Sequence, residues 1–154
     1  MSEISVRTVK LDPIRVAAAL GFGTNPETQA WGRLLDWIEE SGALDDNREH
    51  RFFGFNNPDP SYGSPNYGYE QWVTVGEEAE GTGKVEIETF EGGLYAVTRC
   101  EGVQNIGECW KSLVRWREDS SYQPGTHQWL EELINAPDVA PEAMTFDIYL
   151  PIID

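Results

Sequence analysis

The sequence predicts an α+β fold made of two pseudo-symmetric β-α-β-β repeats, with antiparallel sheets around a central ligand cleft. Three observations predict it. The sequence repeats itself at a fixed offset, each half contains one amphipathic helical segment, and short β-prone segments flank each of those helices.

The internal repeat is clearest around the tryptophans. Four residues of the segment 30–39 recur in the segment 109–118 at an offset of 79 residues: Trp31, Leu34, Trp37 and Glu39 align with Trp110, Leu113, Trp116 and Glu118. The same offset relates Asn56, Pro58 and Asp59 to Asn135, Pro137 and Asp138. We therefore expect a single domain over 1–154, with repeat one at about 4–75 and repeat two at about 83–152.

The first repeat begins with two short segments rich in Val, Ile and Ala, residues 4–10 and 13–20. Asp12-Pro13 lies between them and is a turn signal, so we expect a hairpin there. Two further strands are expected at 50–56 and 67–75, separated by a loop rich in Pro, Gly, Ser and Asn.

A helix is predicted between these pairs of strands. Thr24 or Asn25 can cap it, and Pro26 and Glu27 suit its first turn. Ser41-Gly42 is expected to end it.

The second repeat has the same order of elements. Gly92-Gly93 predicts a hairpin between strands at 85–91 and 94–101. The matching helix is expected at 105–118, and the last two strands at 127–135 and 144–152.

The charge of the chain bears on its partners. The sequence has 11 Lys and Arg against 27 Asp and Glu, a formal net charge of −16. Such a surface repels nucleic-acid phosphates and attracts cations, so we expect no direct binding to nucleic acid.

Neither a membrane span nor a metal site is expected. No segment approaches the ~20 continuous apolar residues of a membrane helix, and the N-terminus lacks the apolar segment of a secretory signal, so a cytoplasmic protein is predicted. Cys100 and Cys109 do not form a metal-ligand pattern, so we expect two thiols, kept reduced by a reducing compartment. His127 and Glu131 have a four-residue spacing, but on a strand they lie too far apart for one ion. No cofactor is predicted.

A carboxylate among apolar residues is the best candidate for a binding site. In the predicted strand 127–135, alternation places Glu131 and Glu132 on opposite faces, and periodicity alone does not choose which one is buried. Their counterparts in the first repeat are Phe52 and Phe53, so the charge is found in only one half. One acidic group beside aromatic rings suits a flat, lipophilic cation.

Several short motifs follow one another along the chain: Gly92-Gly93-Leu94-Tyr95-Ala96-Val97, Gly102, Ile106 with Trp110, Leu130-Glu131, and Asp147-Ile148-Tyr149-Leu150-Pro151-Ile152. Together with Tyr69-Glu70 they resemble GyrI-like small-molecule-binding domains, which include the effector-binding domains of AraC-type and MerR-type multidrug-responsive regulators. The resemblance covers nearly the whole chain and leaves no room for a helix-turn-helix segment, so a stand-alone form is expected.

The resemblance implies a glutamate on the penultimate strand that meets cationic, hydrophobic compounds, and this glutamate matches Glu131. It also implies that Tyr149 and Asp147 of the final strand flank the same pocket. The predicted elements add aromatic walls from four further residues: Trp110, Tyr69, Phe52 and Trp129.

The leading hypothesis is binding of lipophilic, often cationic aromatic small molecules, for sensing or sequestration. The first alternative is enzymatic, because some GyrI-like proteins are hydrolases that open cyclopropane-bearing aromatic toxins; Glu131 would then activate water. The second is a protein interaction, because the family name comes from inhibition of DNA gyrase.

Overall fold

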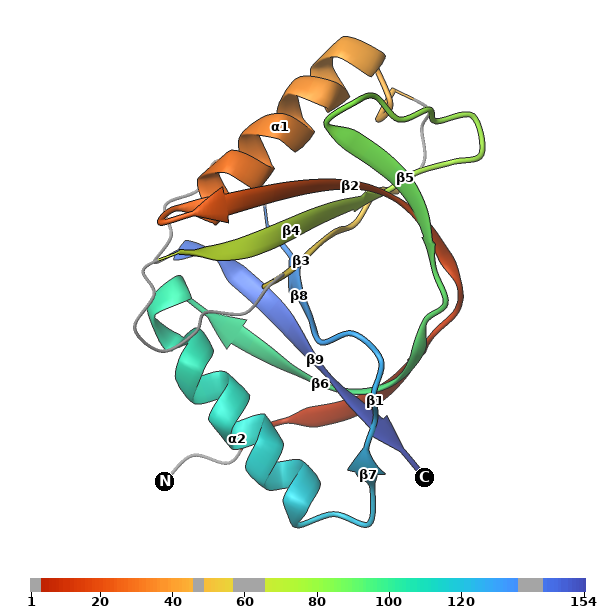
Figure 1. Cartoon of the computed structure of the whole chain (residues 1–154). Coiled ribbons are helices and arrows are strands. Elements are labelled where there is room, and N and C mark those ends of the chain that lie inside the picture. Colours follow the sequence, from red (N-terminus) through yellow and green to blue (C-terminus); the bar gives the residue numbers. More distant parts are fainter. Residues whose placement is uncertain (1–3, 46–48, 57–65, 136–142) are drawn as a thin grey trace. The chain divides into compact units, whose positions relative to one another are not determined.

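The computed structural model describes residues 4–45, 49–56, 66–135 and 143–154. The fold is α+β, as predicted, with antiparallel strands and two α-helices (Figure 1). The chain divides into two compact units: residues 13–90, and residues 1–12 together with 91–154. We call them the middle unit and the terminal unit.

The middle unit is a four-stranded sheet with one helix. The strand order is β3-β4-β2-β5, and each neighbouring pair is antiparallel. The elements are β2 (Ile14–Gly23), α1 (Pro26–Ser41), β3 (Phe52–Asn56), β4 (Tyr67–Thr74) and β5 (Val85–Phe90). Leu34 and Trp37 of α1 pack on Ala17 and Val73, which places the core of this unit between α1 and one face of the sheet.

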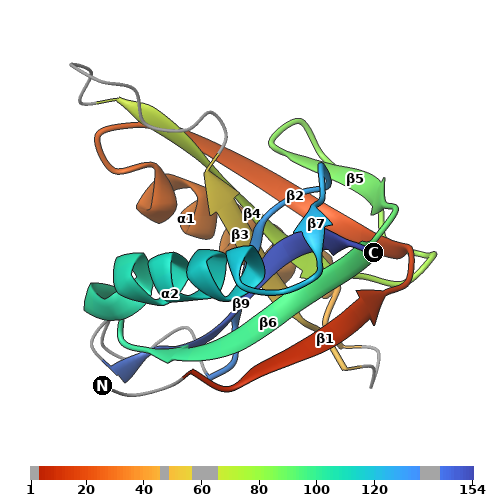
Figure 2. The same ribbon diagram turned by 90° about the horizontal axis from the view of Figure 1, so that it is seen from below.

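The terminal unit repeats this plan. The strand order is β1-β6-β9-β8, again antiparallel, and α2 packs against β6 and β9 (Figure 2). The elements are β1 (Val6–Leu11), β6 (Gly93–Glu101), the 3-10 turn η1 (Val103–Asn105), α2 (Ile106–Glu118), β7 (Gln123–Pro124), β8 (Leu130–Leu133) and β9 (Thr145–Ile153). The short β7 pairs with the end of β9 and was not predicted.

Both predicted hairpins are wrong. β1 pairs with β6 and β2 pairs with β5, so each repeat exchanges its first strand with the other. The remaining strands and helix of each repeat form the predicted β-α-β-β unit, β2-α1-β3-β4 and β6-α2-β8-β9. Whether the chain acts as a single domain stays a prediction.

The glycines at the second expected hairpin have another role. Gly92 has φ +82° and Gly93 has φ +145°, and a Cβ on Gly92 would lie 2.0 Å from the carbonyl oxygen of Leu11. The β5–β6 connection therefore passes against the end of β1, where only glycine fits. The Gly-Gly signal marks a close backbone approach instead of a two-residue turn.

The predicted helices are confirmed. The bounds of α1 agree with Pro26 at its start and with Gly42 after its end, where φ is +64°. The expected N-cap is wrong in one respect, because the side chain of Asn25 makes no capping hydrogen bond. Among the residues that the structure describes, no helix is long and apolar enough to cross a membrane.

The strands are also confirmed, with one notable difference. The segment 127–135 yields only β8, so Trp129 precedes the strand instead of lying within it. The loop expected between the third and fourth strands falls almost wholly on 57–65, outside the described residues.

The prediction of two reduced thiols is wrong. Cys100 on β6 and Cys109 on α2 form a disulfide, with their Cα atoms 6.1 Å apart. The turn at Gly102 and η1 brings the start of α2 back beside the end of β6, within the reach of a disulfide. The bond fastens the helix to its own sheet.

We expect the Cys100→Ser/Cys109→Ser double variant to be less stable than the oxidised protein by about 2.5 kcal/mol, because it loses the closure of a short loop in the unfolded chain. Denaturant unfolding of both proteins, with the reduced wild type as control, measures this difference. Equal unfolding midpoints for the oxidised and reduced wild type would contradict the expectation.

Candidate functional site

The register of the terminal unit separates its sheet into two chemically different faces. Ile148, Leu150 and Ile152 of β9 pack with Leu113 of α2, so they lie on the face covered by that helix. The alternate residues of β9 point the other way. Pairing of Leu130 with Tyr149 and of Glu132 with Asp147 places these four residues together on the face opposite α2, which we call the polar face.

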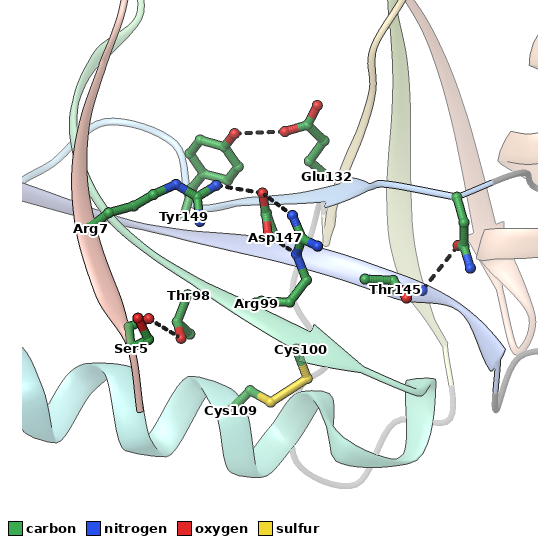
Figure 3. A network of polar contacts seen from close by, with 11 residues as sticks. Ser5, Arg7, Thr98, Arg99, Cys100, Cys109, Glu132, Thr145, Asp147 and Tyr149 are labelled. Atoms are coloured by element: carbon green, nitrogen blue, oxygen red, sulfur yellow. Dashed lines mark hydrogen bonds and ion pairs between the residues drawn. A yellow bond between two sulfur atoms is a disulfide. The ribbon is translucent and has the colours of Figure 1, made fainter. Parts of the chain in front are cut away.

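Glu132 is the buried glutamate of the pair that the sequence left open. Its exposed fraction is 6%, and that of Tyr149 is 2%. The Tyr149 hydroxyl donates a hydrogen bond of 2.6 Å to Oε1 of Glu132 (Figure 3). The ring of Tyr95, on β6, meets the Tyr149 ring edge to face at 5.4 Å. Burial, and then the electrostatic effect of Tyr149, raises the pKa of Tyr95, so the Tyr95 phenol stays protonated at neutral pH.

Asp147 lies next to Glu132 in the same row of the sheet and is held by two arginines. Arg7 donates to Oδ2 at 2.6 Å, and Arg99 donates through Nε to Oδ1 at 2.5 Å (Figure 3). Burial alone would raise the pKa of Asp147, but the hydrogen bonds and charges of Arg99 and Arg7 outweigh it and lower the pKa. Asp147 is therefore ionised at neutral pH.

Glu131 lies on the other side of β8, in line with Ile148. It is half-buried and accepts a hydrogen bond of 3.1 Å from the indole nitrogen of Trp110 on α2. The ring of Trp129 lies 5.1 Å from that of Trp110. Three residues of the predicted site therefore meet on the α2 side, apart from Asp147 and Tyr149.

Tyr69 and Phe52 belong to the middle unit. Phe52 packs on Trp31 of α1 at 5.4 Å, and Tyr69 lies across Gly54, where a Cβ would be 2.1 Å from its hydroxyl oxygen. Both side chains lie on the face of the sheet that α1 covers, since they pair with Val73 and Gly21 respectively.

The middle unit has its own group of acidic and aromatic residues on the face opposite α1. Glu70 accepts a hydrogen bond of 2.5 Å from the Trp72 indole, and the Trp72 ring contacts those of Phe55 and Phe90. Burial, and then the charges of Glu70 and Glu86, raises the pKa of Glu88 beside them. The sequence reasoning did not identify this group.

His127 contacts residues other than Glu131, so the two do not form a metal-binding pair. Its Nε2 is 2.7 Å from the carbonyl oxygen of Leu94, and its ring meets Tyr95 edge to face. In the part of the chain that the structure describes, no three His, Cys, Asp or Glu side chains are grouped closely enough to hold a metal ion.

A comparison with known protein families identifies the family of this chain. A model of the Cass2 family, described as integron-associated effector binding protein, matches residues 7–152. The chain belongs to the Cass2 family. This confirms the resemblance to GyrI-like effector-binding domains and gives the Cass2-family protein an effector-binding, small-molecule-binding fold. No curated protein sequence matches the chain.

Solved structures share the fold of this Cass2-family protein at low identity. A hydrolase from Listeria innocua has a TM-score of 0.73 at 12% identity, with 99% of this chain and 94% of that chain covered. The C-terminal domain of EcmrR has a TM-score of 0.70 at 14% identity, with 97% and 98% covered. SAV2435 bound to tetraphenylphosphonium has a TM-score of 0.60 at 13% identity, with 97% and 94% covered.

The predicted site residues of the Cass2-family protein thus fall into three places. Asp147 and Tyr149 share the polar face, Glu131, Trp110 and Trp129 meet beside α2, and Tyr69 and Phe52 lie in the middle unit. The sequence reasoning missed the arginines, left the buried glutamate open between Glu131 and Glu132, and took Glu131 from the family resemblance. Asp147 and Tyr149 alternate along β9 and therefore share one face, and pairing with β8 places Glu132 on that face. This alternation, combined with the strand pairing, could have selected Glu132. The ligand cleft that the duplication predicts stays a prediction.

The lowered pKa of Asp147 predicts a pH dependence of stability. A carboxyl with a depressed pKa stabilises the fold above its ordinary value of 3.8, and this stabilisation is lost as the pH falls through the lowered folded value. The stability difference between wild type and Asp147→Asn should therefore be largest above about pH 4 and should shrink in stronger acid. Urea unfolding between pH 2 and 7 measures it; a constant difference across this range would show that the arginine contacts do not act through the Asp147 charge.

Proposed function

We propose that the protein binds lipophilic aromatic small molecules that carry a positive charge, with Glu132 and Tyr149 at the centre of the site. The observation that carries the proposal is the nearly inaccessible Glu132 carboxylate, hydrogen-bonded to Tyr149, whose ring meets that of Tyr95. Membership of an effector-binding family supports it.

The electrostatics of such a carboxylate favour a hydrophobic cation. Away from bulk water, the attraction between opposite charges is several times stronger than at the surface, and an organic cation loses less hydration than a metal ion. The Tyr149 ring lies beside the carboxylate, and a ring face turned toward the ligand attracts a cation placed over it. A site of this kind accepts ligands of different shapes, because one charge and flat rings impose few directional demands.

The solved complex of SAV2435 with tetraphenylphosphonium lends support through its fold. Tetraphenylphosphonium is a lipophilic aromatic cation, and the fold of SAV2435 matches 97% of this chain. The identity of 13% relates the folds alone, so the choice of ligand and residues for this chain rests on its own side chains.

Glu131 is the competing assignment for the ligand-binding glutamate. It lies beside Trp110 and Trp129, and these rings provide an aromatic surface of their own. The two glutamates are adjacent on β8 but point to opposite faces, so each is a matched control for the other.

We expect Glu132→Gln to weaken binding of tetraphenylphosphonium by about tenfold or more, because the substitution removes the charge while keeping the size of the side chain. Glu131→Gln should change the affinity less than threefold. Isothermal titration calorimetry of the wild type and both variants measures the effect, with thermal unfolding to check that each variant is folded.

The opposite ranking, with Glu131→Gln the weaker binder, would move the site to the α2 side. Equal affinities for the wild type and both variants would refute a central role for either carboxylate.

A second candidate function is hydrolysis of a small aromatic substrate. The Glu132 carboxylate and the Tyr149 hydroxyl are a hydrogen-bonded base and proton donor, which is the pairing that a hydrolytic step needs. The fold of a hydrolase from Listeria innocua is similar, which adds support at the level of the fold. Product formation from a cyclopropane-bearing aromatic compound, lost in Glu132→Gln, would favour hydrolysis; stoichiometric binding without product would favour the binding function.

A further inference from the structure

We propose that the preferred ligands are amphoteric: aromatic compounds that carry a negatively charged group, such as a carboxylate, in addition to the positive charge. The negative group binds Arg7 and Arg99 at one end of the polar face, while Glu132 takes the positive group at the other. This inference rests on the proposed function and adds the chemical class of the ligand.

The charged residues are arranged in order across the sheet. Glu132 on β8 pairs with Asp147 on β9, and Asp147 pairs with Arg99 on β6. Arg7 lies one strand further, on β1, and reaches the same Asp147 carboxylate. Neighbouring strands are about 4.8 Å apart, so the backbone positions of Glu132 and Arg99 are separated by about 10 Å. The Arg99 guanidinium reaches back to Asp147, so the charged groups lie closer together than the backbone positions do.

The two arginines have more hydrogen-bonding capacity than Asp147 uses. A guanidinium has five N–H donors. Asp147 accepts one hydrogen bond from Arg7 and two from Arg99, the longer of which is 3.4 Å. The side chains of both arginines are 50% exposed, whereas that of Asp147 is 4% exposed. Donors on both guanidiniums therefore remain open to an incoming anionic group.

The local charges are shared among these residues. The two guanidiniums share one hydrogen-bonded carboxylate, that of Asp147, and the charges of Glu132 and Glu101 also act on Arg99. Asp147 stays ionised because its pKa is lowered, and it holds the two arginines side by side, which like charges would otherwise resist. Paired guanidiniums bind a carboxylate with two or more charge-assisted hydrogen bonds.

The two arginines contrast with the acidic character of the rest of the chain. The formal net charge is −16, so the average surface repels an anionic group and attracts a simple cation. A protein that selected ligands by its overall field would favour a plain cation over a zwitterion of the same shape. Selection of the zwitterion would therefore have to come from a particular site.

The test compares rhodamine B with its ethyl ester. Both dyes contain the same lipophilic aromatic cation and have almost the same shape. Rhodamine B also has a free carboxylate and is a zwitterion, whereas its ethyl ester is a plain cation. We expect the wild type to bind rhodamine B about tenfold more tightly than the ester, measured by fluorescence anisotropy at two salt concentrations.

The variants locate the preference. Arg7→Gln and Arg99→Gln should each lower the affinity ratio of the two dyes to about threefold or less, chiefly by weakening rhodamine B. Arg7 lies on an edge strand and leaves Arg99 to hold Asp147, so Arg7→Gln keeps the test valid if Arg99→Gln fails to fold. Arg115→Gln is the matched control, because Arg115 is exposed on α2 and should leave the ratio unchanged.

Each outcome has a distinct meaning. Equal binding of the two dyes, tighter binding of the ester, or a ratio unchanged in both arginine variants overturns the amphoteric class while leaving the proposed function standing. Absence of binding for both dyes and for tetraphenylphosphonium overturns the proposed function, and this inference with it.

Discussion

A carboxylate held out of water beside a tyrosine hydroxyl is the constraint on which the candidate site depends. Charge is costly in such a place, and it is tolerated where hydrogen bonds and neighbouring charges compensate it. Glu132 has the Tyr149 hydroxyl, and Asp147 in the next strand has two arginines. The polar face therefore concentrates charge of both signs within a few strands, in a chain whose surface is otherwise strongly acidic.

The duplicated fold makes this concentration easy to recognise, because the strand registers give each position a counterpart in the other unit. In the last two strands of each unit the offset is 77 residues, so Glu132 corresponds to Phe55 and Tyr149 corresponds to Trp72. The two units share strand order and helix position, yet their faces opposite the helices differ in chemistry. The shared strand order and helix position serve packing of the core. A function specific to one unit can be carried by the face on which the two units differ.

The sequence predicted most of the fold and part of the site. Helical periodicity and the terminal Pro26 and Gly42 located α1, since these signals are local. Strand pairing was mispredicted because Gly92-Gly93 is equally suited to a hairpin and to a close backbone approach, and only the partner at Leu11 distinguishes them. Which of the two glutamates is buried stayed open in the sequence for a related reason. Alternation separates the faces of β8, but only the position of α2 shows which face holds Glu132.

The most direct measurement is a crystal structure of the protein with tetraphenylphosphonium bound. We expect the phosphonium within about 6 Å of the Glu132 carboxylate, with a phenyl ring against Tyr149. A cation bound beside Glu131 and Trp110, or in the middle unit beside Glu70 and Glu88, would contradict the central role of Glu132.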